Sequence, residues 1–407
     1  MSHETPYLLV NAGLHLEEKF CFLAELFFSL IVQSLGVHSQ CSPHELAERQ
    51  GTYGVHPLEA TVATRFLGAS ARVMDPAKAV KKYTRSAAGT IALAHDVRPA
   101  AVLATTVIYL LGPGVFGNEA FPFSVRYGYI ADRLLAVRQD ATMQDLATRR
   151  ALPKVRVMFE SMGRFYIFAQ ARLGGPGGTL QGFDATLNIR SLQTCLTSVL
   201  AIHQSCCDSK VKGEFVAYQL LMSCLVGGSQ GVELADAASI PVTSALAFAK
   251  RTALCVCSSN YAEFFQNFAP LDHTVLLSSQ EERALFLSRC LALELTDHMR
   301  KMALNIMNAA YNKTDKFPIS KLRRILRFES EDATTSFCAR AGVVVHHTSI
   351  DAVANSGFSF AQFHVTKRLS PERELTAAAA SEDGHTALEW RRDSHLLLGS
   401  GAVFGET

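Results

Sequence analysis

Residues 75–95 contain a run of cations whose spacing suits phosphate binding. Asp75 followed by Pro76 is a helix-start signal, because a carboxylate caps the first turn and proline loses no hydrogen bond there. In a helix that begins here, the cations fall at i, i+3, i+4 and i+7 on one face: Lys78, Lys81, Lys82 and Arg85. No Asp or Glu lies between Asp75 and Asp96, so we expect phosphates to supply the counter-charge. A solvated lysine-rich face is the alternative interpretation and carries about equal weight.

Two further segments repeat this basic chemistry. The first carries Arg149, Arg150, Lys154, Arg156 and Arg164. Glu160 lies four residues from both Arg156 and Arg164, which predicts that ion pairs within the helix consume part of this charge. The second segment places Lys321, Arg323, Arg324 and Arg327 on one helical face, opposite Leu322, Ile325 and Leu326. Three basic helices lining one groove would bind RNA phosphates without sequence preference.

The sequence offers no convincing catalytic or cofactor motif. Gly112, Gly114 and Gly117 match G-x-G-x-x-G, but Pro113 removes an N–H that a pyrophosphate would need and Pro122 interrupts the following helix. The chain has no G-x-S-x-G, no H-E-x-x-H and no phosphate-binding loop of the G-x-x-x-x-G-K-[ST] type. We therefore expect no enzyme activity, no catalytic residues and no cofactor.

Cysteine and histidine spacing argues against a metal centre. The ten cysteines include no C-x-x-C pair, so free thiols in a reducing compartment are the better interpretation. His346, His347 and His364 lack a carboxylate at ligand spacing. We expect no metal.

Composition is typical of a globular chain. The 407 residues are 48% hydrophobic and 19% charged, and the net charge of +2 means that a nucleic-acid site must come from local clustering. Phe20–Val32 is strongly apolar, but it is too short for a membrane span, contains Glu25 and lacks the basic flank of a signal peptide. We interpret it as a core helix of a soluble intracellular protein, with no membrane insertion.

Helical periodicity dominates from residue 16 to about residue 328. The predicted helices cover 16–35, 43–50, 57–72, 76–94, 99–111, 124–138, 141–150, 153–173, 184–206, 211–225, 232–257, 279–311 and 318–328. Val343–Val345 is typical of a short strand. The fold class is therefore mainly α.

Glycine clusters at 174–178 and 227–231 suggest where the chain divides, and we place the boundary at the second. The predicted organisation has an N-terminal arm (1–15), an N-terminal helical lobe (16–226), a C-terminal helical lobe (232–345) and a C-terminal arm (346–407). Apolar residues near the end of the tail suggest that this arm becomes ordered against another molecule; they are Leu396, Leu397, Leu398, Val403 and Phe404.

The stretch Asn260–Leu271, which reads NYAEFFQNFAPL, resembles the aromatic Tyr-Ala-x-Phe segment of nucleoproteins from negative-strand RNA viruses of the mononegavirus order. The helical pattern, the basic helices in two lobes and the extensions at both ends are also similar to these proteins. The resemblance implies a two-lobed nucleoprotein-like core with terminal extensions that polymerises and encapsidates genomic RNA in a cleft between the lobes.

The same resemblance implies the partners and the location. Single-stranded RNA would bind in the cleft, and the terminal arms would join copies into a homo-oligomer. A viral polymerase or phosphoprotein would be a further partner, and the protein would occur in the virion and the host cytoplasm or nucleus. Two alternatives stay open, namely a viral capsid or coat subunit that assembles through protein contacts and a helical enzyme whose site a single sequence does not reveal.

Overall fold

The computed structural model describes residues 41–51, 55–61, 73–85, 97–147, 153–174, 182–204, 209–226, 241–268, 279–328, 330–348 and 358–363. These residues are mainly α-helical, as predicted. They form two compact units: one contains the described residues up to Leu173 together with 182–204, and the other contains those from Ser209 onward. Within the described ranges, no helix is both long and apolar enough to cross a membrane.

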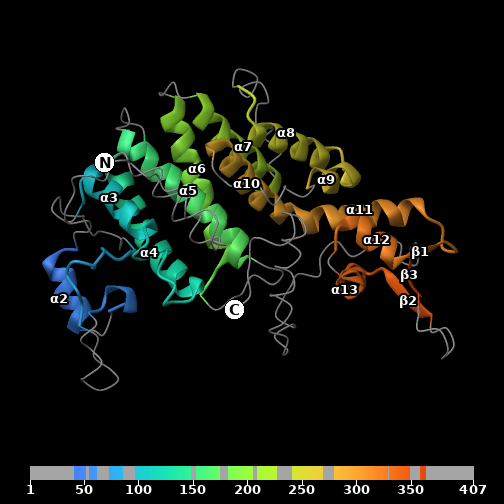
Figure 1. Ribbon diagram of the computed structural model, residues 1–407, viewed down its shortest axis with the longest axis horizontal. Coiled ribbons are helices and arrows are strands. Elements are labelled where there is room, and N and C mark those ends of the chain that lie inside the picture. The colour runs from blue at the N-terminus through green and yellow to red at the C-terminus, as the bar shows by residue number, and fades with distance from the viewer. Residues whose placement is uncertain are drawn as a thin grey trace, which may run out of the picture. The chain divides into compact units, whose positions relative to one another are not determined.

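The first unit is built from long helices preceded by irregular chain (Figure 1). Its elements are α2 (Pro43–Gly51), the 3-10 turn η2 (Pro57–Glu59), α3 (Ala100–Leu111), α4 (Phe123–Met143), α5 (Pro153–Leu173) and α6 (Ala185–Gln204). Helix α5 packs against both α3 and α6, and α3 also packs against α4. The predicted helices over 153–173 and 184–206 are thus confirmed within two residues at each end.

Aromatic side chains fill the core of the first unit. Every residue of α5 from Met158 to Gln170 is buried, as expected for a helix with neighbours on several sides. Phe116, from the loop after α3, lies edge-to-face with Phe165 and Phe168 of α5, at centroid distances of 6.2 and 5.7 Å. This core fixes α4 and α5, the helices that carry the buried polar groups described below.

The second unit begins with a helical part. It contains α7 (Ser209–Val226), α8 (Ser244–Cys257), α9 (Tyr261–Asn267) and α10 (Gln280–Ala292), with α8 packed against α7, α9 and α10. Asn260 caps α9 by accepting a hydrogen bond from the Glu263 N–H at 3.1 Å. Phe264, Phe265 and Phe268 are buried there, so core packing accounts for the aromatic stretch that suggested a viral nucleoprotein.

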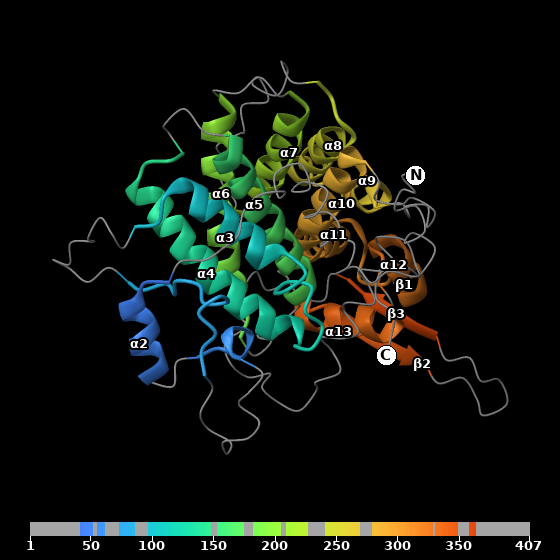
Figure 2. The same cartoon turned by 60° about the vertical axis from the view of Figure 1, so that its left-hand side comes forward.

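The rest of the second unit has winged-helix topology. It contains α11 (Thr296–Ala310), β1 (Lys316–Pro318), α12 (Ile319–Leu326), α13 (Glu331–Ala341), β2 (Val344–Thr348) and β3 (Phe358–Gln362). The strands form an antiparallel sheet in the order β1-β3-β2, with Phe317 opposite Ala361 and Val345 opposite the same alanine (Figure 2). The sheet packs against α12 and α13. Strand β3 lies in the stretch that the sequence assigned to a C-terminal arm.

A buried arginine joins α11 to the end of α12. Arg300, 2% exposed, donates to the carbonyl oxygens of Leu326 (3.2 Å) and Arg327 (2.8 Å), two groups that lie at the end of α12. Its guanidinium also lies 3.9 Å from the centroid of the Phe328 ring. These contacts hold Arg327 in the left-handed region at φ 54°, where the chain turns toward α13.

Several helix predictions are wrong within the described residues. Of the predicted helix 76–94, the described residues 76–85 form a turn at 76–78 followed by chain without regular secondary structure. Of the predicted helix 57–72, the described residues 57–61 form η2 and one side of a bridge between Ala60 and Met74. The predicted helix 279–311 is divided by the 3-10 turn η7 (Leu293–Leu295) into α10 and α11. Residues 144–147 form turns after α4, where the sequence predicted a helix over 141–150.

Other predictions fall outside the described residues. These include the core helix at Phe20–Val32, most of both glycine clusters and the apolar tail positions. The lobe boundary at residues 227–231 therefore stays a prediction, whereas the described residues of the two units separate between Gln204 and Ser209.

Candidate functional site

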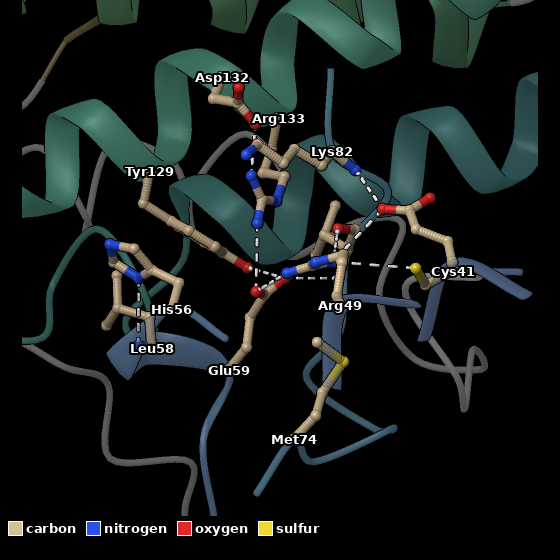
Figure 3. Close-up of polar contacts among 12 residues, drawn as sticks. Cys41, Arg49, His56, Leu58, Glu59, Met74, Lys82, Tyr129, Asp132 and Arg133 are labelled. Carbon is tan, nitrogen blue, oxygen red and sulfur yellow. Dashed lines mark hydrogen bonds and ion pairs between the residues drawn. The ribbon is translucent and has the colours of Figure 1, made fainter. Parts of the chain in front are cut away.

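A cluster of polar side chains in the first unit surrounds Glu59, whose side chain is completely buried (Figure 3). Its carboxylate accepts hydrogen bonds from the guanidinium groups of Arg49 and Arg133, the latter at 3.1 Å. The Tyr129 hydroxyl donates to it at 3.2 Å and the Val80 N–H at 3.0 Å. Four donors from three separate parts of the chain therefore meet at one carboxylate, as a buried charge requires.

Arg49 continues the network along α2. Its guanidinium donates to the Val80 carbonyl at 3.1 Å and lies 3.4 Å from the Glu45 carboxylate and 3.8 Å from the Cys41 sulfur. Glu45 in turn accepts the Lys82 N–H at 2.8 Å. Both backbone groups of Val80 are thus paired with side chains from elsewhere in the chain.

The polar side chains of α4 that contact this network recur at helical spacing. Tyr129, Arg133 and Asp140 occur at i, i+4 and i+11, and all three are buried. Asp140 binds the Lys81 ammonium at 2.8 Å and the Arg98 guanidinium at 2.7 Å. Helix α4 therefore anchors this irregular segment at Val80 through Glu59, and at Lys81 directly.

These contacts explain why residues 76–85 do not form the predicted helix. A helix would pair each N–H with the carbonyl four residues earlier, but here Val80, Lys82 and Tyr83 donate to Glu59, Glu45 and Asp132. Buried backbone groups must be paired, and these side chains satisfy the requirement without a helix. The four cations consequently do not share a helical face, and the ammonium of Lys81 binds Asp140.

Aromatic groups complete the cluster. The His56 ring stacks on Tyr129 at a centroid distance of 4.7 Å, and the Arg133 guanidinium lies 4.6 Å from the same ring. Burial, together with the nearby Glu59 carboxylate, raises the pKa of the Tyr129 hydroxyl, so it stays protonated and donates. Burial raises the pKa of the Cys41 thiol to about 12, so this sulfur is a poor nucleophile at neutral pH.

The arrangement is suited to holding chain segments together rather than to chemical conversion. The carboxylates of Glu59 and Asp140 are each surrounded by donors. Among the described residues, no group of three or more His, Cys, Asp or Glu side chains is placed to hold a metal ion. We refer to Arg49, Glu59, Tyr129, Arg133 and Asp140 with their partners as the α4 clamp.

The remaining predicted site residues have different surroundings. Lys82 and Arg85 are exposed, and Lys78 lies 3.3 Å from Asp75. Lys154 is exposed at the start of α5, while Arg156 and the buried Arg164 both lie 3.8 Å from Glu160, which confirms the predicted ion pairs within this helix. Arg149 and Arg150 lie outside the described residues.

The third basic segment forms α12 as predicted, within two residues at each end. Lys321, Arg323 and Arg324 are exposed, and Leu322 and Leu326 are buried on the other side. This segment belongs to the second unit, whereas the other two belong to the first. Whether these cations form a binding site stays a prediction.

Sequence reasoning missed the anchoring residues of the α4 clamp. Glu59 is the one Asp, Glu, Lys or Arg in residues 55–64, and a lone charge there signals a buried partner, whereas Arg133 stands next to Asp132 and Asp140 is two residues from Arg138, so neither gave such a signal. The partner itself could not be identified, because Lys81 and Asp140 are 59 positions apart and Glu59 and Arg133 are 74 apart.

Comparison with known proteins assigns the chain to a family. Residues 40–347 match the sequence profile of the SAC3/GANP family, which is more than half of the 407-residue chain and includes residues of both units. The chain belongs to the SAC3/GANP family. The SAC3/GANP domain is a non-catalytic scaffold, which confirms the prediction that the chain is not an enzyme.

Two relatives support this assignment. The chain is 28% identical over 277 residues to SAC3 family protein B of Arabidopsis thaliana, covering 62% of this chain and 15% of the relative. It is 26% identical over 296 residues to SAC3 family protein 1 of Schizosaccharomyces pombe, covering 67% of this chain and 27% of the relative. The chain thus spans well under a third of the length of either protein.

Membership of the SAC3/GANP family corrects the viral interpretation. The predicted viral nucleoprotein, its encapsidation of genomic RNA and its location in a virion or the host cytoplasm are wrong, because the matching proteins are cellular proteins of a plant and a yeast. The predicted partners, which were single-stranded RNA, further copies joined by terminal arms and a viral polymerase or phosphoprotein, are wrong for the same reason. The alternative of a viral capsid or coat subunit rested on the same viral interpretation and is therefore also wrong.

Proposed function

We propose that this SAC3/GANP chain is a non-catalytic scaffold that holds protein partners together in nuclear mRNA export, as a component of a TREX-2 assembly. The observation that carries the proposal is the family match over residues 40–347. We place its action in the nucleus and at the nuclear pore on the same ground.

The buried carboxylates bind groups of the chain itself, and this supports a scaffold role. Glu59 and Asp140 are completely buried and bind donors from distant parts of the chain. Binding surfaces gain affinity and specificity when the elements that carry them are rigid. The α4 clamp stiffens an otherwise irregular segment, residues 73–85, so that this segment presents a defined surface to a partner.

We also propose that the two units have different roles. The first unit is a helical framework ordered by the α4 clamp, and the second ends in a winged helix with exposed cations on α12. Because the chain spans 15% and 27% of the two relatives, partners of the remaining parts of those proteins need not bind this chain.

Depletion and rescue in the cells that make this protein test the proposal. Removing the protein should cause polyadenylated RNA to accumulate in the nucleus, as seen by in situ hybridisation with an oligo(dT) probe. The wild-type chain should restore the normal distribution, and the Asp140→Asn variant should restore it poorly because it loosens the segment held by α4. An unchanged distribution after depletion would overturn the role in export.

A further inference from the structure

Arg98 has hydrogen-bond donors that the α4 clamp does not use. The residue is 4% exposed, and its Nε–H donates to the Asp140 carboxylate at 2.7 Å. Nη1 and Nη2 are buried as well, and no acceptor among the described residues lies within hydrogen-bonding distance of either nitrogen. These two nitrogens carry most of the N–H donors of a group that is always charged. Buried donors of this kind cost free energy unless an acceptor meets them, so a bound ion or water belongs there.

Asp140 does not supply a whole negative charge to Arg98. Its other oxygen binds the Lys81 ammonium at 2.8 Å, so one carboxylate is divided between two cations. Among the described residues, Asp140 is the one carboxylate within ion-pairing distance of Arg98. A second anion beside Nη1 and Nη2 would therefore meet a buried cation whose charge is only partly balanced.

The start of α3 lies beside this guanidinium. One oxygen of Asp140 accepts both the Arg98 backbone N–H, at 3.4 Å, and the Nε–H, so the side chain folds back toward its own backbone, one residue before the N-cap Pro99. No side chain caps this 12-residue helix, and its first turn has no acidic residue. Within the described part of the chain, no acceptor pairs with the backbone N–H of Ala100 or Ala101. The positive end of the α3 dipole is thus also without a counter-charge.

We propose that Arg98 and the N-terminus of α3 bind a free oxyanion of the phosphate class. The Nη1–H and Nη2–H groups would donate to the ion in the forked geometry that suits a guanidinium, and the N–H groups of Ala100 and Ala101 would donate at the helix end. Burial of Arg98 favours a small ion over a phosphorylated side chain of a partner, because the partner would have to bring its chain against a residue that is 4% exposed.

The surroundings of the site are held in place by the protein itself. Gln144, which directly follows α4, donates to the carbonyl oxygen of Arg98 at 2.8 Å and to that of Asp140 at 2.9 Å. The two residues are therefore positioned before the ion arrives, and a preorganised site loses little free energy on binding. This inference goes beyond the scaffold role in export and does not depend on it, since the ion would bind whether or not a protein partner is present.

Thermal unfolding of the purified full chain in matched salts tests for the ion. Sodium phosphate should raise the unfolding temperature above that in sodium chloride of equal ionic strength, because a ligand that binds only the folded state stabilises it. Phosphate and sulfate also stabilise folded proteins in general, so the specific effect is the part that substitutions in the site remove. Isothermal titration calorimetry with phosphate should detect a single site per chain.

Substitutions at the helix end form a matched pair. Ala101 is exposed in the first turn of α3, where an acidic side chain favours the helix, so Ala101→Asp should fold. Its carboxylate takes the place of the ion and repels it, so we expect the affinity for phosphate to fall by about tenfold or more, and Ala101→Asn should lower it far less.

Substitution of the arginine tests the other half of the site. Arg98→Gln should abolish phosphate binding, and Arg324→Gln, which removes a charge from an exposed position of α12, should leave it unchanged. Circular dichroism checks that each variant is folded. If Arg98→Gln does not fold, the comparison of Ala101→Asp with Ala101→Asn decides the matter.

Three results would overturn the proposal. They are calorimetry that detects no phosphate binding, phosphate binding that Ala101→Asp leaves unchanged, and binding at this site of a phosphoserine peptide where free phosphate does not bind. The first result would mean that water alone meets the donors of Arg98, and the third would assign the site to a modified partner protein.

Discussion

Glu59 shows how one residue organises a region that has little regular structure. Its carboxylate is the shared partner of Arg49 on α2, Arg133 on α4 and the N–H of Val80. Two guanidinium groups that are themselves buried share this negative charge, and each has one further carboxylate partner, Glu45 for Arg49 and Asp132 for Arg133. A buried charge that loses its partner is far more costly than a solvated one.

We therefore expect Glu59→Gln to lower the free energy of unfolding by about 1–3 kcal/mol, since it removes the buried anion that Arg49 and Arg133 share and leaves each with one carboxylate, Glu45 or Asp132. Glu263→Gln is the control: Glu263 is half-exposed and lies 3.9 Å from the exposed Arg251, so its loss should cost about 0–1 kcal/mol. Urea unfolding followed by circular dichroism measures both. Equal losses for the two variants would show that Glu59 does not hold the network.

Because several thiols are buried, we expect the free energy of unfolding to fall at alkaline pH. Burial raises the pKa of Cys290 and Cys338 from 9.0 to about 12 and that of Cys195 to about 11. The folded protein keeps these protons where the unfolded chain releases them, so the stabilisation is complete below pH 9 and is lost as pH rises toward 12.

We expect Cys290→Ala to flatten the fall in unfolding free energy between about pH 9 and pH 10.5, because one titrating group is removed. Leu291→Ala, which leaves a cavity in the same helix without removing a titrating group, should leave the slope unchanged. Urea unfolding at a series of pH values supplies the slopes. The slope is the test, since removing the Cys290 side chain also leaves a cavity that lowers stability at every pH.

At the scale of elements, α4 supports residues 79–85, a segment without regular secondary structure. Asp140 binds Lys81, Asp132 accepts the Tyr83 N–H at 3.3 Å, and Gln139 donates to the Thr84 carbonyl at 3.2 Å. These side chains replace the hydrogen bonds that a helix or sheet would supply.

Asp140→Asn should release this segment from α4 while leaving the helix itself intact. The amide cannot provide the charge that Lys81 and Arg98 require, so we expect faster hydrogen exchange in residues 79–85, measured by mass spectrometry. Asp75→Asn is the control, because Asp75 pairs with Lys78 at a partly exposed position. Unchanged exchange in 79–85 would mean that Asp140 does not hold the segment.

At the scale of the whole molecule, the chain divides into two compact units, and each contains aromatic packing of its own. Phe116, Phe165 and Phe168 belong to the first, whereas Phe264 and Phe268 belong to the second. Residues in different cores with no shared partner contribute independently to stability.

We expect calorimetry of the full chain to resolve two unfolding transitions. Glu59→Gln should lower the temperature of one transition and Arg300→Met that of the other, because Arg300 holds the carbonyls of Leu326 and Arg327 in the second unit. Arg324→Met, at an exposed position of α12, should change neither. A single transition shifted by both core variants would contradict this independence.

Much of the helical framework follows from the sequence alone. The apolar periodicity of 153–173 predicts α5 with its observed bounds, and the alternation of cations with Leu322 and Leu326 predicts α12. Such patterns are local, because side chains three or four residues apart share a helix face wherever the helix lies. Ion pairs within α5 were predictable for the same reason.

Residues 76–85 depended on contacts that no local pattern contains. Asp75 and Pro76 form a good helix start, yet the Val80 N–H is paired with Glu59, 21 positions away, and Lys81 with Asp140, 59 positions away. The sheet likewise pairs β1 with β3 across more than 40 residues of chain. Buried polar groups take whichever partner the packed helices bring within reach, so tertiary packing here overrides a helix signal that spans only one turn.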